Sequence, residues 1–139
     1  MCNQAFISCT KNSTDKTKTE LLTTGGWRLE SKQTKISTAS AYTDITSGIV
    51  TCKKDDVLSF TNPSTYTVTE GATKCNAANA DIVAIGTWAL LNNQNDLKIT
   101  VGTTSTTYVL YLVTENILTI DETDASGIVV INNRYTYAH

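Results

Sequence analysis

The chain has 139 residues, of which 40% are hydrophobic, and a formal net charge of −2 at pH 7. This length fits one domain with one core, and a slightly acidic surface gives no electrostatic basis for binding nucleic acid. No run of residues is long and apolar enough to span a bilayer as a helix. Threonine is the compositional outlier, with 26 residues, and its β-branched side chain suits a half-solvated pleated surface. The composition therefore predicts a protein built mainly of strands.

The N-terminal part is predicted to be a tail, residues 1–19, ahead of a single domain, residues 20–139. Residues 10–20 are polar and charged, which is typical of a flexible tether. Just before them, Ala5-Phe6-Ile7-Ser8-Cys9 resembles the end of a bacterial lipoprotein signal, where a lipid is attached to the cysteine. This resemblance makes Cys9 the candidate lipidation site and the only link to a membrane. In the alternative, Cys9 is a tail thiol paired with Cys2.

The domain is predicted to begin with one helical turn over Glu20-Leu21-Leu22, which covers one end of the fold. A strand over residues 27–36 follows Gly25-Gly26. The next two strands, 57–60 and 65–69, are joined by Asn62-Pro63-Ser64, a strong turn signal, and should form a hairpin.

Cys52 and Cys75 flank this hairpin, 23 positions apart. Because a hairpin returns the chain close to its start, the two cysteines should come within bridging distance. We expect a disulfide in an oxidising compartment. A pair of buried free thiols is the alternative, and a zinc site is not indicated because no histidine or further cysteine stands nearby.

Five further strands are indicated by alternating apolar and polar residues. They cover residues 82–93, 96–101, 106–113, 116–121 and 128–137. Short polar connections favour antiparallel neighbours, and eight antiparallel strands avoid exposed edges most simply by closing. The predicted fold is all-β, an eight-stranded antiparallel up-and-down barrel. A two-sheet sandwich is the competing architecture.

The alternation places one set of apolar side chains on the inward face of these strands. Its members are Leu58, Phe60, Tyr66, Val68, Trp88, Leu90, Leu97, Ile99, Tyr108, Leu110, Leu118 and Ile120. A small barrel either fills its interior with such side chains or holds one small ligand. The set is therefore both the candidate ligand-binding lining and the candidate packed core. In the first case, the tyrosines and Trp88 supply polar groups and stacking faces.

Several motifs resemble the lipocalin-like domains of secreted lipoproteins in Bacteroidetes-type bacteria. They are Gly26-Trp27-Arg28-Leu29, the segment from Cys52 to Phe60, Tyr66, Gly71, Cys75, Gly86-Thr87-Trp88 and Asn116-Ile117-Leu118. The resemblance spans residues 20–139. It implies an eight-stranded barrel with an internal ligand cavity, in which Trp27 has the structural role of closing the barrel base. It also implies a location in the bacterial cell envelope, or secretion.

Catalytic signatures are scarce. The only histidine is His139, so no second histidine is present to serve as a base in a Ser-His-Asp or Cys-His arrangement. The acidic clusters are Asp55-Asp56 and Asp121-Glu122 with Asp124, which we interpret as turn-capping or solvated acids. Calcium ligation by the second cluster is an alternative, although its spacing matches no known loop. We expect no metal, no cofactor and no enzymatic activity.

The sequence is compatible with three functions, all for an expected monomer. The first is an anchored protein that binds a small apolar or amphipathic molecule in the barrel. The second is a solid-core module that contacts a protein or glycan through an outer patch of Tyr111, Tyr135 and Tyr137. The third is a glycan- or lipid-processing enzyme with a site at the barrel mouth.

Overall fold

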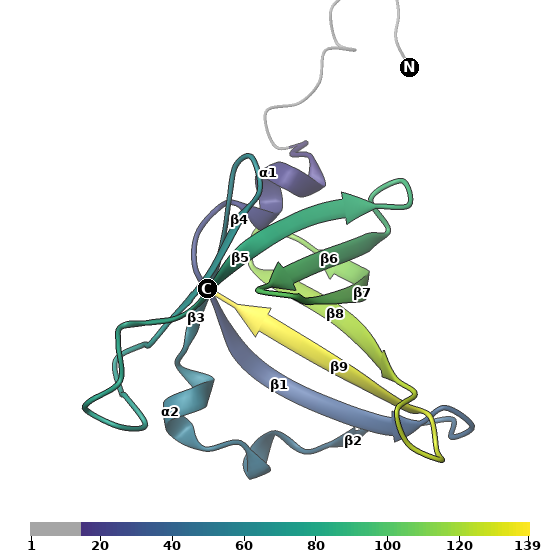
Figure 1. The fold of residues 1–139 in the computed structure, drawn as a ribbon. Helices are drawn as coiled ribbons and strands as arrows, with labels where there is room; N and C mark the ends of the chain where they lie inside the picture. Colours follow the sequence, from purple (N-terminus) through teal and green to yellow (C-terminus); the bar gives the residue numbers. More distant parts are fainter. Residues whose placement is uncertain (1–14) are drawn as a thin grey trace, which may run out of the picture.

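The computed structural model describes residues 15–139, so the predictions on Cys2 and Cys9 lie outside the described part. Strands dominate it (Figure 1). They are β1 (Trp27–Ile36), β2 (Thr43–Asp44), β3 (Val57–Thr61), β4 (Thr65–Thr69), β5 (Ile82–Leu91), β6 (Asp96–Val101), β7 (Thr104–Val113), β8 (Ile117–Asp124) and β9 (Ile131–Ala138). The helical elements are α1 (Lys18–Leu22), the 3₁₀ turn η2 (Thr46–Gly48) and α2 (Thr51–Lys54). Among the described residues, no helix combines the length and apolar character needed to cross a membrane.

The strands form one antiparallel sheet that closes on itself. Its order is β2-β1-β3-β4-β5-β6-β7-β8-β9, and β1 also pairs with β9. Eight strands make the barrel, and β2 is an extra strand that pairs with the second half of β1. Each barrel strand lies beside its neighbour in sequence, so the predicted up-and-down barrel is confirmed and the sandwich is not formed.

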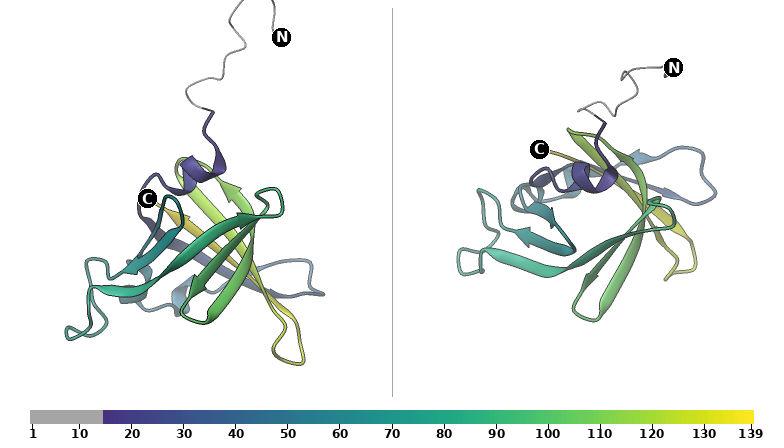
Figure 2. Two further views of the ribbon diagram at one scale, coloured as in Figure 1. Left: turned by 45° about the horizontal axis from the view of Figure 1, so that its top comes forward. Right: turned by 90° about the horizontal axis from the view of Figure 1, so that it is seen from above.

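One end of the barrel is sealed by α1 (Figure 2). A capping box begins this helix, since the Thr17 hydroxyl accepts a hydrogen bond from the Glu20 amide and the Glu20 carboxylate accepts one from the Thr17 amide. Leu22, at the end of α1, and Trp27, at the start of β1, are both fully buried. The Trp27 indole donates to the Leu22 carbonyl over 3.0 Å. The two residues therefore plug the barrel together, and the predicted helical turn lies where it was expected.

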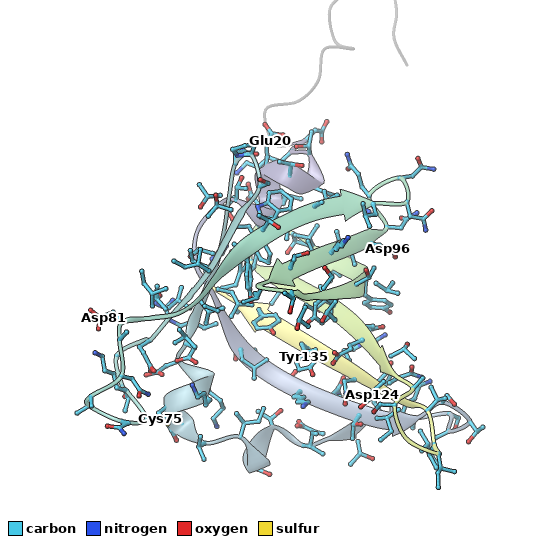
Figure 3. The ribbon with its side chains drawn as sticks, in the orientation of Figure 1. Glu20, Cys75, Asp81, Asp96, Asp124 and Tyr135 are labelled. Carbon is cyan, nitrogen blue, oxygen red and sulfur yellow. A yellow bond between two sulfur atoms is a disulfide. The ribbon has the colours of Figure 1, made fainter. Side chains whose placement is uncertain are left out.

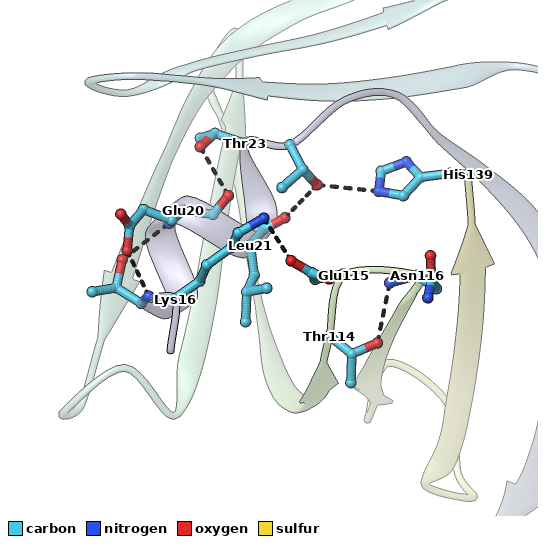
Figure 4. A network of polar contacts seen from close by, with 10 residues as sticks. Lys16, Glu20, Leu21, Thr23, Thr114, Glu115, Asn116 and His139 are labelled. Atoms are coloured by element: carbon cyan, nitrogen blue, oxygen red, sulfur yellow. Dashed lines mark hydrogen bonds and ion pairs between the residues drawn. The ribbon is translucent and has the colours of Figure 1, made fainter. Parts of the chain in front are cut away.

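Polar contacts tie the sealed end to the last strand (Figure 4). The His139 ring stacks on Trp27 with 3.9 Å between ring centroids, and its Nδ1 donates to the Gly26 carbonyl over 2.7 Å. Lys16 forms an ion pair of 2.6 Å with Glu115 in the β7–β8 turn. Both ends of the described chain thus meet at the sealed end.

The segment between β1 and β3 contains elements that the sequence did not indicate. Strand β2 makes only two residue pairs with β1, and Val50, the N-cap of α2, makes no side-chain capping hydrogen bond. Helix α2 carries Cys52, which forms the predicted disulfide with Cys75 across a Cα–Cα distance of 5.1 Å. The bridge attaches α2 to the β4–β5 loop.

Gly86 lies on β5 directly against the backbone of β6. A Cβ atom built on Gly86 would collide with the Thr100 carbonyl oxygen of β6, which is backbone and cannot turn aside. A side chain at this position therefore requires the two strands to separate. Gly48, in η2, has nothing within 4 Å of the same position.

We predict that Gly86→Ala lowers the free energy of unfolding by about 1–3 kcal/mol, because it overpacks a strand pair. Gly48→Ala is the matched control and should change it by less than about 0.5 kcal/mol. Urea denaturation followed by circular dichroism measures both. Equal stability of the two variants would contradict the strand spacing described here.

We also predict that replacing Cys52 and Cys75 together by alanine lowers the free energy of unfolding by about 3 kcal/mol, because the unfolded chain regains the freedom of a closed loop. Reductant should destabilise the wild-type protein to the same level and leave the double variant unchanged. A wild-type protein that is insensitive to reductant under denaturing conditions would argue against the bridge.

Candidate functional site

The candidate site is the interior of the barrel. Every residue predicted to face inward lies in the core or packs against it. Phe60, Tyr66, Trp88, Leu97, Ile99, Leu110, Leu118 and Ile120 are buried, and Leu58, Val68, Leu90 and Tyr108 are partly buried against them. Five more core residues were not in the predicted inward set: Trp27, which was expected to close the base, and Leu22, Val113, Tyr135 and Tyr137. The last two alternate with Arg134 and Thr136, a signal that would have placed them inside.

Exposure of the inward side chains rises from the α1 end to the opposite end. On β6, Leu97 is 0% exposed, Ile99 8% and Val101 36%. The same order holds on β7, where Leu110 is buried and Tyr108 only partly so. On β8, Leu118 and Ile120 are buried. Glu122, the next residue of β8 on the inward face, is half-buried. The barrel is therefore packed solid beneath α1 and accessible at the other end, here called the open end.

Tyr135 is the centre of the aromatic groups at the open end, and Figure 3 labels it on the interior side of β9. Its ring meets Tyr108 edge-on and stacks with Tyr137, each at 6.5 Å between centroids. Its hydroxyl donates to the Glu122 carboxylate over 3.0 Å, and the Lys32 ammonium lies 5.1 Å from its ring centroid. A tyrosine, an acidic side chain and a basic side chain thus lie together beside apolar side chains.

Lys32 faces inward because of an irregularity in β1. The pairing with β9 shifts register between Leu29 and Ser31, so the inward face passes from odd-numbered to even-numbered residues. Sequence alternation alone did not reveal this. Lys32 was not a predicted site residue, and Glu122 was named only in the calcium alternative.

Burial sets the ionisation of the interior tyrosines. It raises the pKa of Tyr66 to about 12, with a smaller contribution from Tyr108. Burial also raises the pKa of Tyr108, Tyr135 and Tyr137, and the charge of Glu122 adds to each of these increases. Within residues 15–139, the hydroxyls of Tyr66 and Tyr137 form no hydrogen bond with another side chain or backbone group. They are neutral hydrogen-bonding groups available to a molecule inside the barrel.

The expected outer patch of Tyr111, Tyr135 and Tyr137 is wrong, because the two tyrosines of β9 point inward. Only Tyr111 is exposed, at 59%. It lies at an irregularity in the β7–β8 pairing and contacts Arg134, whose guanidinium is 4.0 Å from the Tyr111 ring centroid and 4.6 Å from that of Tyr42.

The acids of β8 do not converge, so they form no calcium site. Asp121 faces outward and accepts two hydrogen bonds from Arg134, of 2.7 and 2.8 Å. Glu122 faces inward, since adjacent residues of a strand point to opposite faces. Asp124 accepts hydrogen bonds from the amide and hydroxyl of Ser126, as the turn-capping interpretation predicts.

The acids that follow α2 are less solvated than predicted. Asp56 is 8% exposed, and burial raises the pKa of its carboxyl despite Lys53 at 3.5 Å. Asp55 accepts a hydrogen bond from the Thr73 amide. One buried oxygen each of Asp55, Asp56 and Glu70 lacks a hydrogen-bond partner. Glu70 also lines a pocket of about 220 Å³, together with Lys53, two residues of the β4–β5 loop and the first two residues of β5.

Over the described residues, no group of three or more His, Cys, Asp or Glu side chains is placed to hold a metal ion. Comparison with known protein families gives no match to the chain, and no curated protein matches it significantly. The interior geometry is therefore the basis for assigning a function.

We predict that stability falls as the pH rises from about 10 to about 12. The neutral Tyr66 phenol is favoured in the folded state, so its contribution is present below its ordinary pKa of 10 and is lost as the pH passes its folded pKa of about 12. The loss from this group is at most about 2.7 kcal/mol, from two pKa units. Denaturant titrations at pH 9, 10, 11 and 12 measure it.

Tyr66→Phe should flatten this pH dependence, whereas Tyr111→Phe, on the outer face, should leave it unchanged. Parallel curves for the wild-type protein and Tyr66→Phe would refute the assigned role of Tyr66.

Proposed function

We propose that this protein is a non-catalytic, lipocalin-like binding protein that holds a small apolar or amphipathic molecule at the open end of its barrel. The observation that carries the proposal is the graded exposure of the inward face. Fully buried side chains under α1 provide a stable base, and partly exposed apolar and aromatic side chains at the open end provide a surface that a ligand can cover.

The chemistry of the open end favours an amphipathic ligand. Leu58, Val68 and Tyr108 offer apolar and aromatic contact area. Glu122 and Lys32 at this end, and the hydroxyls of Tyr66 and Tyr137 deeper in the barrel, add a few polar groups that fix orientation. Ligand sites are typically apolar with a small number of such groups.

The proposed location is the bacterial cell envelope, with Cys9 as the lipid-bearing residue. The Cys52–Cys75 disulfide supports an oxidising compartment. Helix α1, through which an N-terminal anchor would connect, covers the end of the barrel opposite to the proposed ligand site. An anchor on that side leaves the open end accessible.

A second candidate function is an interaction module that uses the outer surface. The specific observation is the exposed Tyr111 beside Arg134 and Tyr42. An exposed aromatic ring next to an arginine is a common anchor in protein interfaces.

The test is a titration with two amphipathic fluorescent probes, 8-anilinonaphthalene-1-sulfonate and a dansylated undecanoate. We expect saturable binding at one site. Ala84 and Ile85 are neighbours on β5, but Ala84 pairs with the inward-facing Val68 and Ile85 is exposed on the outside. Ala84→Phe should fill the open end and weaken binding at least about tenfold, or about 1.4 kcal/mol. Ile85→Phe, the matched control, should bind as the wild-type protein does.

Absence of saturable binding, or equal weakening by both variants, would overturn the proposal. A melting temperature for Ala84→Phe close to that of Ile85→Phe establishes that any loss is local. Pull-down experiments with Tyr111→Ala address the second candidate separately.

A further inference from the structure

A second pocket lies at the sealed end of the barrel, on the side opposite to the proposed ligand site. Its volume is about 480 Å³, within the range of about 300–1,000 Å³ of ligand pockets. Its lining comes from α1, the β3–β4 turn and the end of β5 with its following turn, and these elements are drawn in Figures 1 and 2. The lining residues are Thr19, Asn62, Pro63, Ser64, Trp88, Ala89, Leu90 and Gln94.

The walls of this pocket are fixed to one another by hydrogen bonds. The Lys18 ammonium of α1 donates to the Gln94 carbonyl over 2.7 Å. The Trp88 amide donates to the Ser64 carbonyl over 2.8 Å, and its indole donates to the Thr61 carbonyl over 3.1 Å. The pocket is therefore built from rigid elements.

Four polar side chains in the lining have uncommitted hydrogen-bonding groups. In the described part of the chain, the amides of Asn62 and Gln94 and the hydroxyls of Thr19 and Ser64 make no hydrogen bond. Gln94 belongs to the tight β5–β6 turn, in which Asn92, Asn93 and Gln94 all have a positive φ, so the turn geometry fixes its place in the wall.

The rest of the lining is apolar and none of it is charged. Trp88, Leu90, Pro63 and Ala89 provide hydrocarbon surface next to the amides and hydroxyls. The nearby Lys18 ammonium is engaged by the Gln94 carbonyl. A charged ligand would find no counter-ion in these walls, and a purely apolar one would cover the polar groups without satisfying them.

We propose that this pocket binds a neutral saccharide. A sugar ring presents hydroxyls at its edges, which match side-chain amides and hydroxyls, and C–H faces, which match the exposed Pro63 ring and the half-buried Leu90 side chain. The volume accommodates one or two sugar rings. The site shares no lining residue with the polar groups of the open end, so it stands whether or not a ligand binds there.

The experiment is a titration of the ¹⁵N-labelled full chain with cellobiose, maltose, lactose and N,N′-diacetylchitobiose, followed by ¹H–¹⁵N correlation spectra. We expect saturable shifts of the Trp88 indole and of the Asn62 and Gln94 side-chain amides for at least one sugar. A Kd of about 1 mM is a realistic expectation for so open a site.

Variants locate the binding. Asn62→Ala with Gln94→Ala should weaken the affinity at least about tenfold, and Gln94→Ala adds no strain because both residues carry a Cβ. Ala89→Phe should occupy the pocket and abolish the shifts. Asn116→Ala, in the neighbouring β7–β8 turn, is the matched control and should bind like the wild-type protein.

Lack of saturable shifts with all four sugars would overturn the proposal. Binding that survives in Ala89→Phe, shifts confined to the open end, or tighter binding of glucuronate than of the neutral sugars would overturn it equally.

Discussion

The pairing of the first barrel strand with the last is the constraint on which the rest of the structure depends. Eight residue pairs join β1 to β9, whereas only two join β1 to β3. Without β9, the second half of β1 would keep only its short contacts with β2 and with Ile45 and Thr46 at η2. Closure removes the two long edges of the sheet and gives the inward side chains an enclosed volume. It also brings His139 onto Trp27, so that the same pairing that closes the barrel seals its base.

One end of the enclosed volume stabilises the fold, and we propose that the other end binds the ligand. Beneath α1, large side chains such as Trp27, Leu97 and Leu118 leave no exposed surface. At the other end, the inward face passes through tyrosines to Glu122 and Lys32. A side chain that fills the base adds to the free energy of unfolding, whereas a partly exposed one at the open end is free to contribute to binding. The solid-core and ligand-cavity alternatives drawn from the sequence each describe one end of the same barrel.

Local patterns were sufficient for most of the fold and insufficient for the site. Strict alternation located β3, β4 and β6 and the inward set, because each signal lies within a few consecutive residues. Lys32 was missed because the register shift in β1 is visible only with β9 beside it. Asp56 was assigned to solvent because its burial arises only in the folded chain and leaves no local signal in the sequence. The pocket at Gln94 was missed for the same reason, since its walls come from three separate segments.

The antiparallel closure also has a mechanical consequence. Strand β1 begins, and strand β9 ends, at the sealed end, so a force that separates the two chain ends acts across the β1–β9 seam at one extremity. Such a load breaks hydrogen-bonded pairs one after another, starting beside Arg28 and Ala138, instead of shearing all of them at once. The β1–β9 pairing therefore holds the barrel closed against thermal motion but gives little resistance to a force that pulls the two chain ends apart. A tether on α1 alone applies no such load, because tension entering at a single terminus leaves the seam unstressed.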